Sequence, residues 1–316
     1  MVKTKKIRLK DIAYSLGVSV TCVSRSLRDC SDISEDTKKL IRAKAIELGY
    51  QSKYNEIKTK EKYVVALIFD SIKNPYFIKL GDYLISRLNK EDYDFLIMIT
   101  DPFVKVDDLI IKKCIFRNAD IILSFNEFSE KAVEISKINN IPLVLLGRIS
   151  AFDYVDSIFT DDKKGGHLAF NYLVNENKRK LLYIEESRSE ASLRRLAGFQ
   201  KDKEKYPGLD IKVVEANNLN NAIDYIKKGY DGIFTYNDYI SLDLIKLLES
   251  NNLLNENLKI VGYDDDVDYL NKYFKNYKSV SFDYEKVSDL VISIIKNKLE
   301  KKIKGKTYLF KIDVNL

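Results

Sequence analysis

The chain has 316 residues, of which 45% are hydrophobic and 32% are charged, and its formal net charge is +6. This composition is typical of a soluble globular protein of two or three domains, and no apolar run approaches the length of a membrane span. The three cysteines have no metal-ligand spacing, and the basic start lacks the apolar core of a signal peptide, so we expect a cytoplasmic protein without a membrane partner.

The basic residues are concentrated at the start of the chain. Residues 1–62 contain 15 Lys or Arg and 8 Asp or Glu, whereas residues 63–316 contain 38 and 39. A positive excess confined to the first fifth of the chain suits a phosphate-binding module attached to a neutral body.

Residues 7–28 predict two short helices joined by a tight turn. A first apolar stripe at helical spacing comprises Leu9, Ile12, Ala13 and Leu16. Gly17 ends this helix because glycine tolerates the left-handed backbone, and Ser19 can cap the second. Two such helices form a helix-turn-helix, whose second helix enters the DNA major groove. A helical hairpin without a DNA partner has the same spacing, and the basic charge favours the DNA-binding interpretation.

The second helix divides into an inner and an outer face. Val23 and Leu27 point inward, which leaves on the other faces Val20, Thr21, Ser24, Arg25 and Arg28. Ser34 then opens a third helix, whose apolar residues Ile41, Ala45 and Leu48 can close a small core. The polar, charged residues 51–62 predict a linker.

From Tyr63 onward, apolar runs of strand length alternate with amphipathic helices. The runs span residues 63–69, 94–100, 119–125 and 142–146, and then 181–184, 211–214, 231–235 and 258–263. Helical stretches include Pro75–Asn89, Lys131–Asn139 and Lys286–Leu299. Continuous apolar strands that alternate with helices predict parallel sheets covered on both faces, here in two successive α/β halves.

Short motifs in the first fifty residues carry a resemblance to a known family. They are Leu9-Lys10-Asp11-Ile12-Ala13, Gly17-Val18-Ser19, Val23-Ser24-Arg25, Ser34 to Thr37 and Leu48-Gly49-Tyr50. With further matches to the end of the chain, they resemble the lactose-repressor (LacI/GalR) family of transcriptional regulators. The resemblance implies an α/β protein with an N-terminal three-helix helix-turn-helix domain and a two-lobed, type I periplasmic-binding-protein-like core of doubly wound parallel sheets.

The same resemblance implies the domain boundaries. Residues 1–50 are the expected DNA-binding domain, 51–62 the hinge, and 63–316 the effector-binding and dimerisation core. Within this core, lobe 1 spans about 63–160 and 284–305, and lobe 2 about 161–283 and 306–316, with crossovers near Thr160 and Phe282. The family hinge inserts a leucine into the minor groove, but Thr59 stands at that position here and Ile57 is the one aliphatic residue. We therefore expect residues 51–62 to bind DNA mainly by charge, and the alternative is that the register slips and Ile57 serves as the wedge.

The expected DNA contacts fall into two groups. Hydroxyls that hold phosphates and fix the register come from Ser19, Ser24, Ser34 and Thr37. Base edges meet Val20, Thr21 and Arg25, with Arg25 the best candidate for a bidentate guanine contact and Val20 for a thymine methyl. Arg8 and Arg28 complete the expected set. Ser34 and Thr37 have simple helix capping as the alternative role, which for Ser34 can coexist with phosphate binding.

Polar and aromatic residues follow the predicted strands, where an open α/β sheet binds its ligand. The expected effector contacts are Tyr76, Phe77, Asp161, Arg195, Asn237 and Asp264, with Asp161 implied by the family alone. Carboxylate, guanidinium and amide groups suit a polyhydroxyl ligand, and an aromatic side chain can lie on the apolar face of a sugar or a base. The alternatives are a turn cap for Asp264, an ion pair for Arg195 and core packing for the aromatic residues.

No catalytic constellation or metal site is expected, and no cofactor. His167, the single histidine, is predicted at a helix start with a loop or capping role. We expect a homodimeric, sequence-specific transcriptional repressor that binds pseudo-palindromic operator DNA and is controlled by a sugar or sugar derivative. The alternatives are a regulator of the same fold controlled by a partner protein or corepressor, and a cytoplasmic sugar-binding protein.

Overall fold

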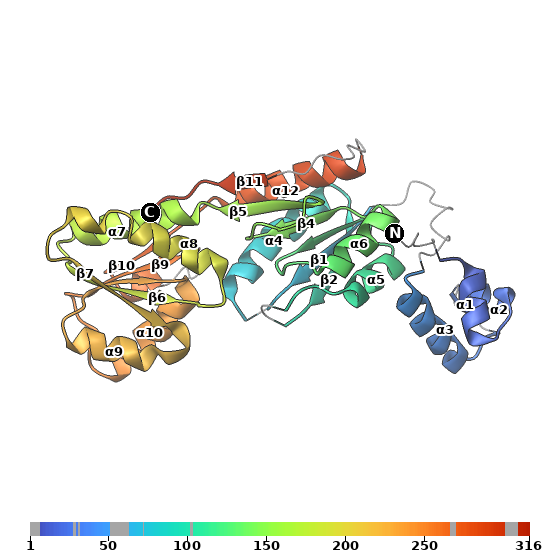
Figure 1. Cartoon of the computed structure of the whole chain (residues 1–316), viewed down its shortest axis with the longest axis horizontal. Helices are drawn as coiled ribbons and strands as arrows, with labels where there is room; N and C mark the ends of the chain where they lie inside the picture. The colour runs from blue at the N-terminus through green and yellow to red at the C-terminus, as the bar shows by residue number, and fades with distance from the viewer. Residues whose placement is uncertain are drawn as a thin grey trace. The chain divides into compact units, whose positions relative to one another are not determined.

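The computed structural model describes residues 7–27, 30, 32–50, 63–71, 73–101, 104–265, 270–300 and 309–316 (Figure 1). The chain separates into two compact units. Unit 1 comprises Met1–Ser71, Leu84–Ile158 and Ser288–Leu309, and unit 2 comprises Ile72–Tyr83, Phe159–Val287 and Phe310–Leu316. The predictions for residues 51–62, which include Ile57 and Thr59, and for Arg28 lie outside the described residues.

The N-terminal helices are α1 (Leu9–Leu16), α2 (Val20–Leu27) and α3 (Glu35–Leu48). They enclose a core of their own, in which the fully or almost fully buried residues are Ile12, Ala13, Val23, Ile41, Ala45 and Tyr50. Gly17 ends α1 with φ +63°, in the left-handed region that favours glycine. The predicted three-helix domain with its turn is therefore confirmed.

A six-stranded sheet has the strand order β11-β5-β4-β3-β1-β2. Its strands are β1 (Val64–Phe69), β2 (Asp94–Ile99), β3 (Ile121–Ser124), β4 (Leu143–Leu146), β5 (Val155–Thr160) and β11 (Leu309–Ile312). The pairs that join β1 to β2 and β3, and β4 to β3 and β5, are parallel. One face is covered by α5 (Asp108–Phe116) and α6 (Glu130–Asn139), which bury Ile111 and Val133 against strand residues such as Ile68 and Ile122. The connecting helices α4 (Pro75–Lys90) and α12 (Tyr284–Leu299) are joined in unit 1 by an ion pair of 2.6 Å between Arg87 and Asp289.

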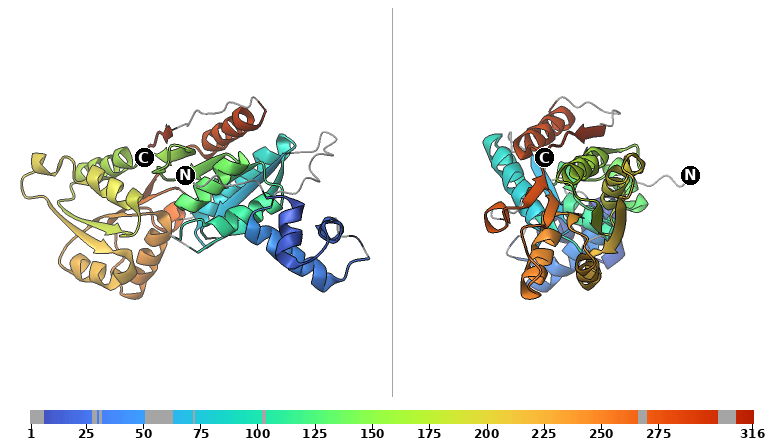
Figure 2. Two further views of the ribbon diagram at one scale, coloured as in Figure 1. Left: turned by 45° about the vertical axis from the view of Figure 1, so that its right-hand side comes forward. Right: turned by 90° about the vertical axis from the view of Figure 1, so that its left-hand side faces the viewer.

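A five-stranded sheet in unit 2 has the order β10-β9-β8-β6-β7. Its strands are β6 (Lys180–Glu185), β7 (Asp210–Glu215), β8 (Gly232–Thr235), β9 (Lys259–Tyr263) and β10 (Tyr277–Val280), and their pairs are parallel. Figure 1 and the turned views of Figure 2 show helices on both faces of this sheet. The helices α7 (Asp162–Asn175) and α8 (Glu190–Phe199) lie on one face, and α9 (Leu219–Lys227) and α10 (Asp238–Ser250) on the other.

The observed sheets confirm the predicted fold class, and all eight apolar runs are strands. β5 and β10 were not predicted because polar residues interrupt their apolar pattern. Asp156 and Ser157 of β5 are buried, and Lys298 neutralises Asp156 at 3.0 Å. The prediction that His167 lies at a helix start is wrong, because α7 begins five residues earlier and places His167 in its second turn. There its Nε2 lies 3.1 Å from the amide nitrogen of Asn171.

Candidate functional site

The second helix of the helix-turn-helix presents the predicted face to solvent. Ser19 caps α2, since its hydroxyl accepts a hydrogen bond of 3.0 Å from the N–H of Cys22. Val23 is fully buried, whereas Val20, Thr21 and Arg25 are exposed. Burial of one face in the core therefore fixes which side chains of α2 can reach a groove.

The start of α3 presents two hydroxyl groups. The Ser34 hydroxyl accepts a hydrogen bond of 3.3 Å from the N–H of Thr37, and the two hydroxyl oxygens lie 2.8 Å apart. Ser34 is exposed, so capping leaves it accessible. Arg8 is also exposed, and its backbone N–H donates to the Asp11 carboxylate at 2.7 Å.

An ion pair on the DNA-binding domain was not predicted. The Arg25 guanidinium contacts the Asp32 carboxylate at 2.8 Å. The hydrogen bond to Asp32 raises the pKa of Arg25, and the same bond lowers the pKa of Asp32. Nothing in the helical periodicity signals this contact, because Asp32 lies in the turn between α2 and α3.

In unit 2, a buried arginine contacts polar and aromatic groups at the carboxyl ends of two strands. Arg195 of α8 is 5% exposed. Its Nε donates to Asp162 at 3.0 Å, its Nη1 donates to the carbonyl oxygen of Tyr236, and its Nη2 lies 3.7 Å from the Asp264 carboxylate. The guanidinium also lies 3.4 Å from the ring centroid of Tyr263. Burial disfavours its charged form, but Asp162 and Asp264 raise the pKa of Arg195 well above its ordinary value.

Close packing of α7 against α8 positions this arginine. A Cβ at Gly166 would lie 1.9 Å from the carbonyl oxygen of Arg195, and a Cβ at Gly198 would lie 2.0 Å from that of Lys163. Only glycine allows the two helices to approach this closely. The approach brings Asp162, the first residue of α7, within reach of both Arg195 and Arg194.

Asp264 follows β9 in an unusual backbone conformation. Its φ is +97°, in a region that side-chain-bearing residues rarely adopt. The side chain is buried, and none of the other described residues donates a hydrogen bond to its carboxylate within 3.5 Å. Burial raises the pKa of Asp264 to about 6, although Arg195 acts to lower it. The carboxylate therefore retains capacity to accept hydrogen bonds from a ligand.

The predicted aromatic pair belongs to a larger aromatic group in unit 2. The ring centroids of Tyr76 and Phe77 are 5.1 Å apart, and that of Tyr76 lies 6.2 Å from Phe282. Tyr284 lies beside Phe282 and donates its hydroxyl to the carbonyl oxygen of Asp264 at 2.7 Å. Burial and the Asp264 charge raise the pKa of Tyr76. The structure thus brings Tyr76 close to Asp264 and Arg195.

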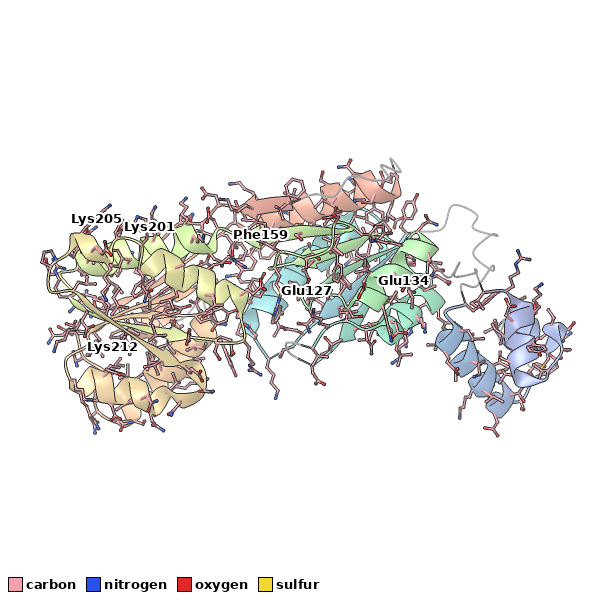
Figure 3. All side chains as sticks on the ribbon, in the orientation of Figure 1. Glu127, Glu134, Phe159, Lys201, Lys205 and Lys212 are labelled. Carbon is pink, nitrogen blue, oxygen red and sulfur yellow. The ribbon has the colours of Figure 1, made fainter. Side chains whose placement is uncertain are left out.

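Asn237 and Asp161, which the sequence also suggested, have clear structural roles. The side-chain oxygen of Asn237 caps α10 by accepting from the N–H of Ile240 at 3.0 Å. Asp161, directly after β5, whose Phe159 is labelled in Figure 3, caps α7 and lies 2.8 Å from the Lys311 amine. Burial acts to raise the pKa of Asp161, but the hydrogen bond from Lys311 lowers it below its ordinary value.

Unit 1 has a polar cluster of its own at the carboxyl ends of β1 and β3, which sequence reasoning missed. Asp70 is 5% exposed and Asn126 is 1% exposed. One carboxylate oxygen of Asp70 and the amide oxygen of Asn126 accept no hydrogen bond from the described residues. Burial raises the pKa of Asp70 to about 6, against the effect of Arg148, whose nearest nitrogen lies 3.9 Å away. Their positions directly after apolar strands were the signal that could have identified them.

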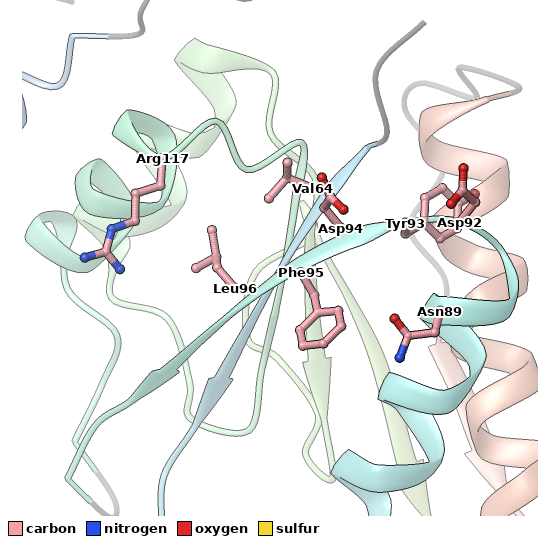
Figure 4. A pocket seen from close by; sticks show the side chains of 8 residues that line it. All are labelled: Val64, Asn89, Asp92, Tyr93, Asp94, Phe95, Leu96 and Arg117. Carbon is pink, nitrogen blue, oxygen red and sulfur yellow. The ribbon is translucent and has the colours of Figure 1, made fainter. Parts of the chain in front are cut away.

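A pocket of about 450 Å³ lies at the amino ends of β1 and β2 (Figure 4). Its charged side chains are Asp92, Asp94 and Arg117, all exposed. In the described part of the chain, no three His, Cys, Asp or Glu side chains gather as metal ligands. No described helix is both long and apolar enough to cross a membrane.

Comparisons with known proteins match this architecture. Residues 8–53 match the sequence profile of bacterial regulatory proteins, lacI family. The HTH-type transcriptional repressor PurR of Actinobacillus pleuropneumoniae (serotype 3) is 25% identical over 283 residues, which cover 81% of this chain and 80% of that protein.

Two solved structures share the fold. A LacI family transcriptional regulator from Enterococcus faecium with bound ribose has a TM-score of 0.70 at 18% identity, over 80% of this chain and 96% of that one. The Lac repressor dimer bound to operator has a TM-score of 0.66 at 15% identity, over 99% of this chain and 98% of that one. Residues 8–53 thus match the lacI family of bacterial regulatory proteins, and the chain is similar to transcriptional regulators over about four fifths of its length.

Proposed function

We propose that this protein is a sequence-specific transcriptional repressor that binds operator DNA as a homodimer and responds to a small sugar or sugar derivative. The observation that carries the proposal is the exposed face of α2, which the buried core of the domain leaves free to enter a major groove. The similar PurR protein is a repressor, and the similar Lac repressor dimer is bound to operator.

On the DNA face, Arg25 and Val20 read base edges together with Thr21, and hydroxyl groups bind phosphates. The phosphate-binding hydroxyls belong to Ser19, Ser24, Ser34 and Thr37, with Arg8 and Arg28 as further contacts. The positive excess of residues 1–62 supports this assignment because phosphate binding dominates affinity for DNA.

In unit 2, the effector binds at the cluster of Arg195, Asp264, Tyr76 and Phe77. A buried carboxylate with spare acceptor capacity, a guanidinium at 3.7 Å and neighbouring aromatic rings suit a ligand with hydroxyl groups and an apolar face. The ribose bound to the similar Enterococcus regulator supports a sugar. Asn237 and Asp161 complete the proposed contacts beyond their capping roles.

The chain divides into three functional parts. Residues 1–50 bind DNA, 51–62 form the hinge, and 63–316 form the effector-binding and dimerisation core, with the lobes divided as expected from the sequence. The similar curated proteins are transcriptional regulators, and we infer that this chain acts in the cytoplasm by binding and not by catalysis. The effector binds two conformations of the core with different affinities and thereby shifts the equilibrium between them.

Gel shifts with operator duplex, with and without sugars identified by thermal-shift screening, test the proposal. Arg25→Ala should lower operator affinity by about tenfold to a hundredfold and relax the preference at one base of each half-site. Ser24→Ala should weaken binding without changing the preference.

Asp264→Asn should abolish the sugar response and leave DNA binding by the sugar-free protein near wild type. Asp243→Asn, on the exposed side of α10, is the matched control and should respond normally. Full operator affinity and selectivity in Arg25→Ala would refute the DNA face, and a normal sugar response in Asp264→Asn would refute the effector site.

A further inference from the structure

The Arg25–Asp32 ion pair occupies the surface that would face DNA. The two side chains are 45% and 49% exposed and meet at 2.8 Å. The backbone adds to this link, because the N–H of Cys30 donates to the carbonyl oxygen of Arg25 at 3.1 Å. The turn after α2 is thus tied to Arg25 through both a side chain and the backbone.

Asp32 affects two kinds of DNA contact in opposite ways. Its negative charge offsets that of Arg25 and repels nearby phosphates, which weakens any binding that depends on charge alone. A guanidinium has five N–H donors in a rigid fork, so a carboxylate on one nitrogen leaves donors for the O6 and N7 acceptors of a guanine. Because Asp32 already holds the Arg25 guanidinium in place, this side chain loses less conformational entropy when it binds a guanine.

We propose that Asp32 is a specificity-determining residue of the DNA-binding domain. It orients Arg25 for a base contact and suppresses the pairing of Arg25 with phosphates in non-specific complexes. This inference rests on the proposed DNA-binding function. Asp32 acts through Arg25, so it is a positioning residue and needs no contact of its own with a base.

The test compares the full chain on two duplexes by fluorescence anisotropy at several salt concentrations. One duplex is selected by the wild-type chain from a random pool, and the other is a shuffled duplex of the same composition. The variants are Asp32→Asn, Arg25→Ala and the double variant. Asp36→Asn is the charge-matched control, because Asp36 is an exposed acid on the first turn of α3 in the same domain.

Asp32→Asn should raise affinity for the shuffled duplex by about threefold to tenfold, and should steepen its salt dependence by about one released counterion. The ratio of selected to shuffled affinity should fall by a similar factor. Asp36→Asn should change both duplexes alike, and the loss of selectivity caused by Asp32→Asn should disappear in the Arg25→Ala background.

Two results would overturn the inference while leaving DNA binding intact. One is that Asp32→Asn and Asp36→Asn behave identically, and the other is that the effect of Asp32→Asn persists without Arg25. A wild-type chain that does not distinguish the two duplexes would instead reject the proposed function, and this inference with it.

Discussion

At the scale of single residues, Asp70 makes stability depend on pH. Its pKa in the folded protein is raised to about 6 by burial. An aspartate in an unfolded chain has a pKa of about 4, so the folded protein binds this proton more tightly. The stabilising contribution is therefore fully present below pH 4 and is lost as the pH rises through 6. Above pH 7, the buried charge costs roughly 2–3 kcal/mol.

Asp70→Asn should consequently raise the free energy of unfolding at pH 8 by up to about 2–3 kcal/mol, with the gain disappearing near pH 4. Urea unfolding over pH 4–8 measures this difference. Asp94→Asn, which replaces an exposed acid of β2, is the matched control variant. A gain that does not vary with pH would show that Asp70 is not charged and buried in the folded protein.

Sequence reasoning reached some residues of the candidate site and missed their partners. Arg195 was proposed because it lies in a family motif, and Asp264 because it directly follows an apolar strand. Asp161 was named from the sequence, and its neighbour Asp162 was missed. In the structure Asp161 caps α7, whereas Asp162, one position later, accepts the hydrogen bond from Arg195. Asp32 was missed because its contact depends on how a turn folds back on α2. Such contacts depend on tertiary geometry, which a periodic pattern does not encode.

At the scale of elements, periodicity predicted strands where both faces are apolar and failed where a buried strand carries charge. β1, with the sequence VVALIF, is buried along nearly its whole length. β5 is equally buried, but Asp156 is tolerated there only because Lys298 supplies the opposite charge. Because Asp156 and Lys298 are far apart in the sequence, no local sequence pattern indicates that their charges form a pair.

The packing of α7 on α8 leads to a prediction at the same scale. Gly166→Ala places a Cβ 1.9 Å from the backbone oxygen of Arg195, so the helices must separate. We expect a cost of about 1–3 kcal/mol and a weakened sugar response, because Arg195 moves with α8. Both the urea midpoint of unit 2 and the sugar-induced thermal shift should fall.

Gly208→Ala is the control for this substitution. Gly208 has φ +79°, and a Cβ added there would meet no heavy atom within 4 Å, so its replacement costs backbone strain alone. Its sugar response should remain normal even if its stability falls. An unchanged sugar response in Gly166→Ala would mean that helix spacing does not position Arg195.

At the scale of the whole molecule, the proposed homodimer predicts how operator affinity depends on the geometry of the DNA. Each copy contributes one α2, and that helix has only eight residues, so one half-site offers few base contacts. Two copies joined through their cores gain from a high effective concentration at the second half-site. A duplex with one half-site scrambled should therefore bind at least about a hundredfold more weakly than the intact operator.

Changing the distance between the two half-sites tests dimeric recognition more directly. Half-sites that are read together must present their major grooves on related faces of the duplex, and about ten base pairs make one turn. Inserting five base pairs between the half-sites rotates one groove by half a turn and should lower affinity nearly as much as scrambling a half-site does. Equal binding to the intact, half-scrambled and five-base-pair-expanded duplexes in an anisotropy titration would show that a single copy reads the DNA. In that case the proposed dimeric recognition would be wrong, while the assignment of α2 to the groove would still stand.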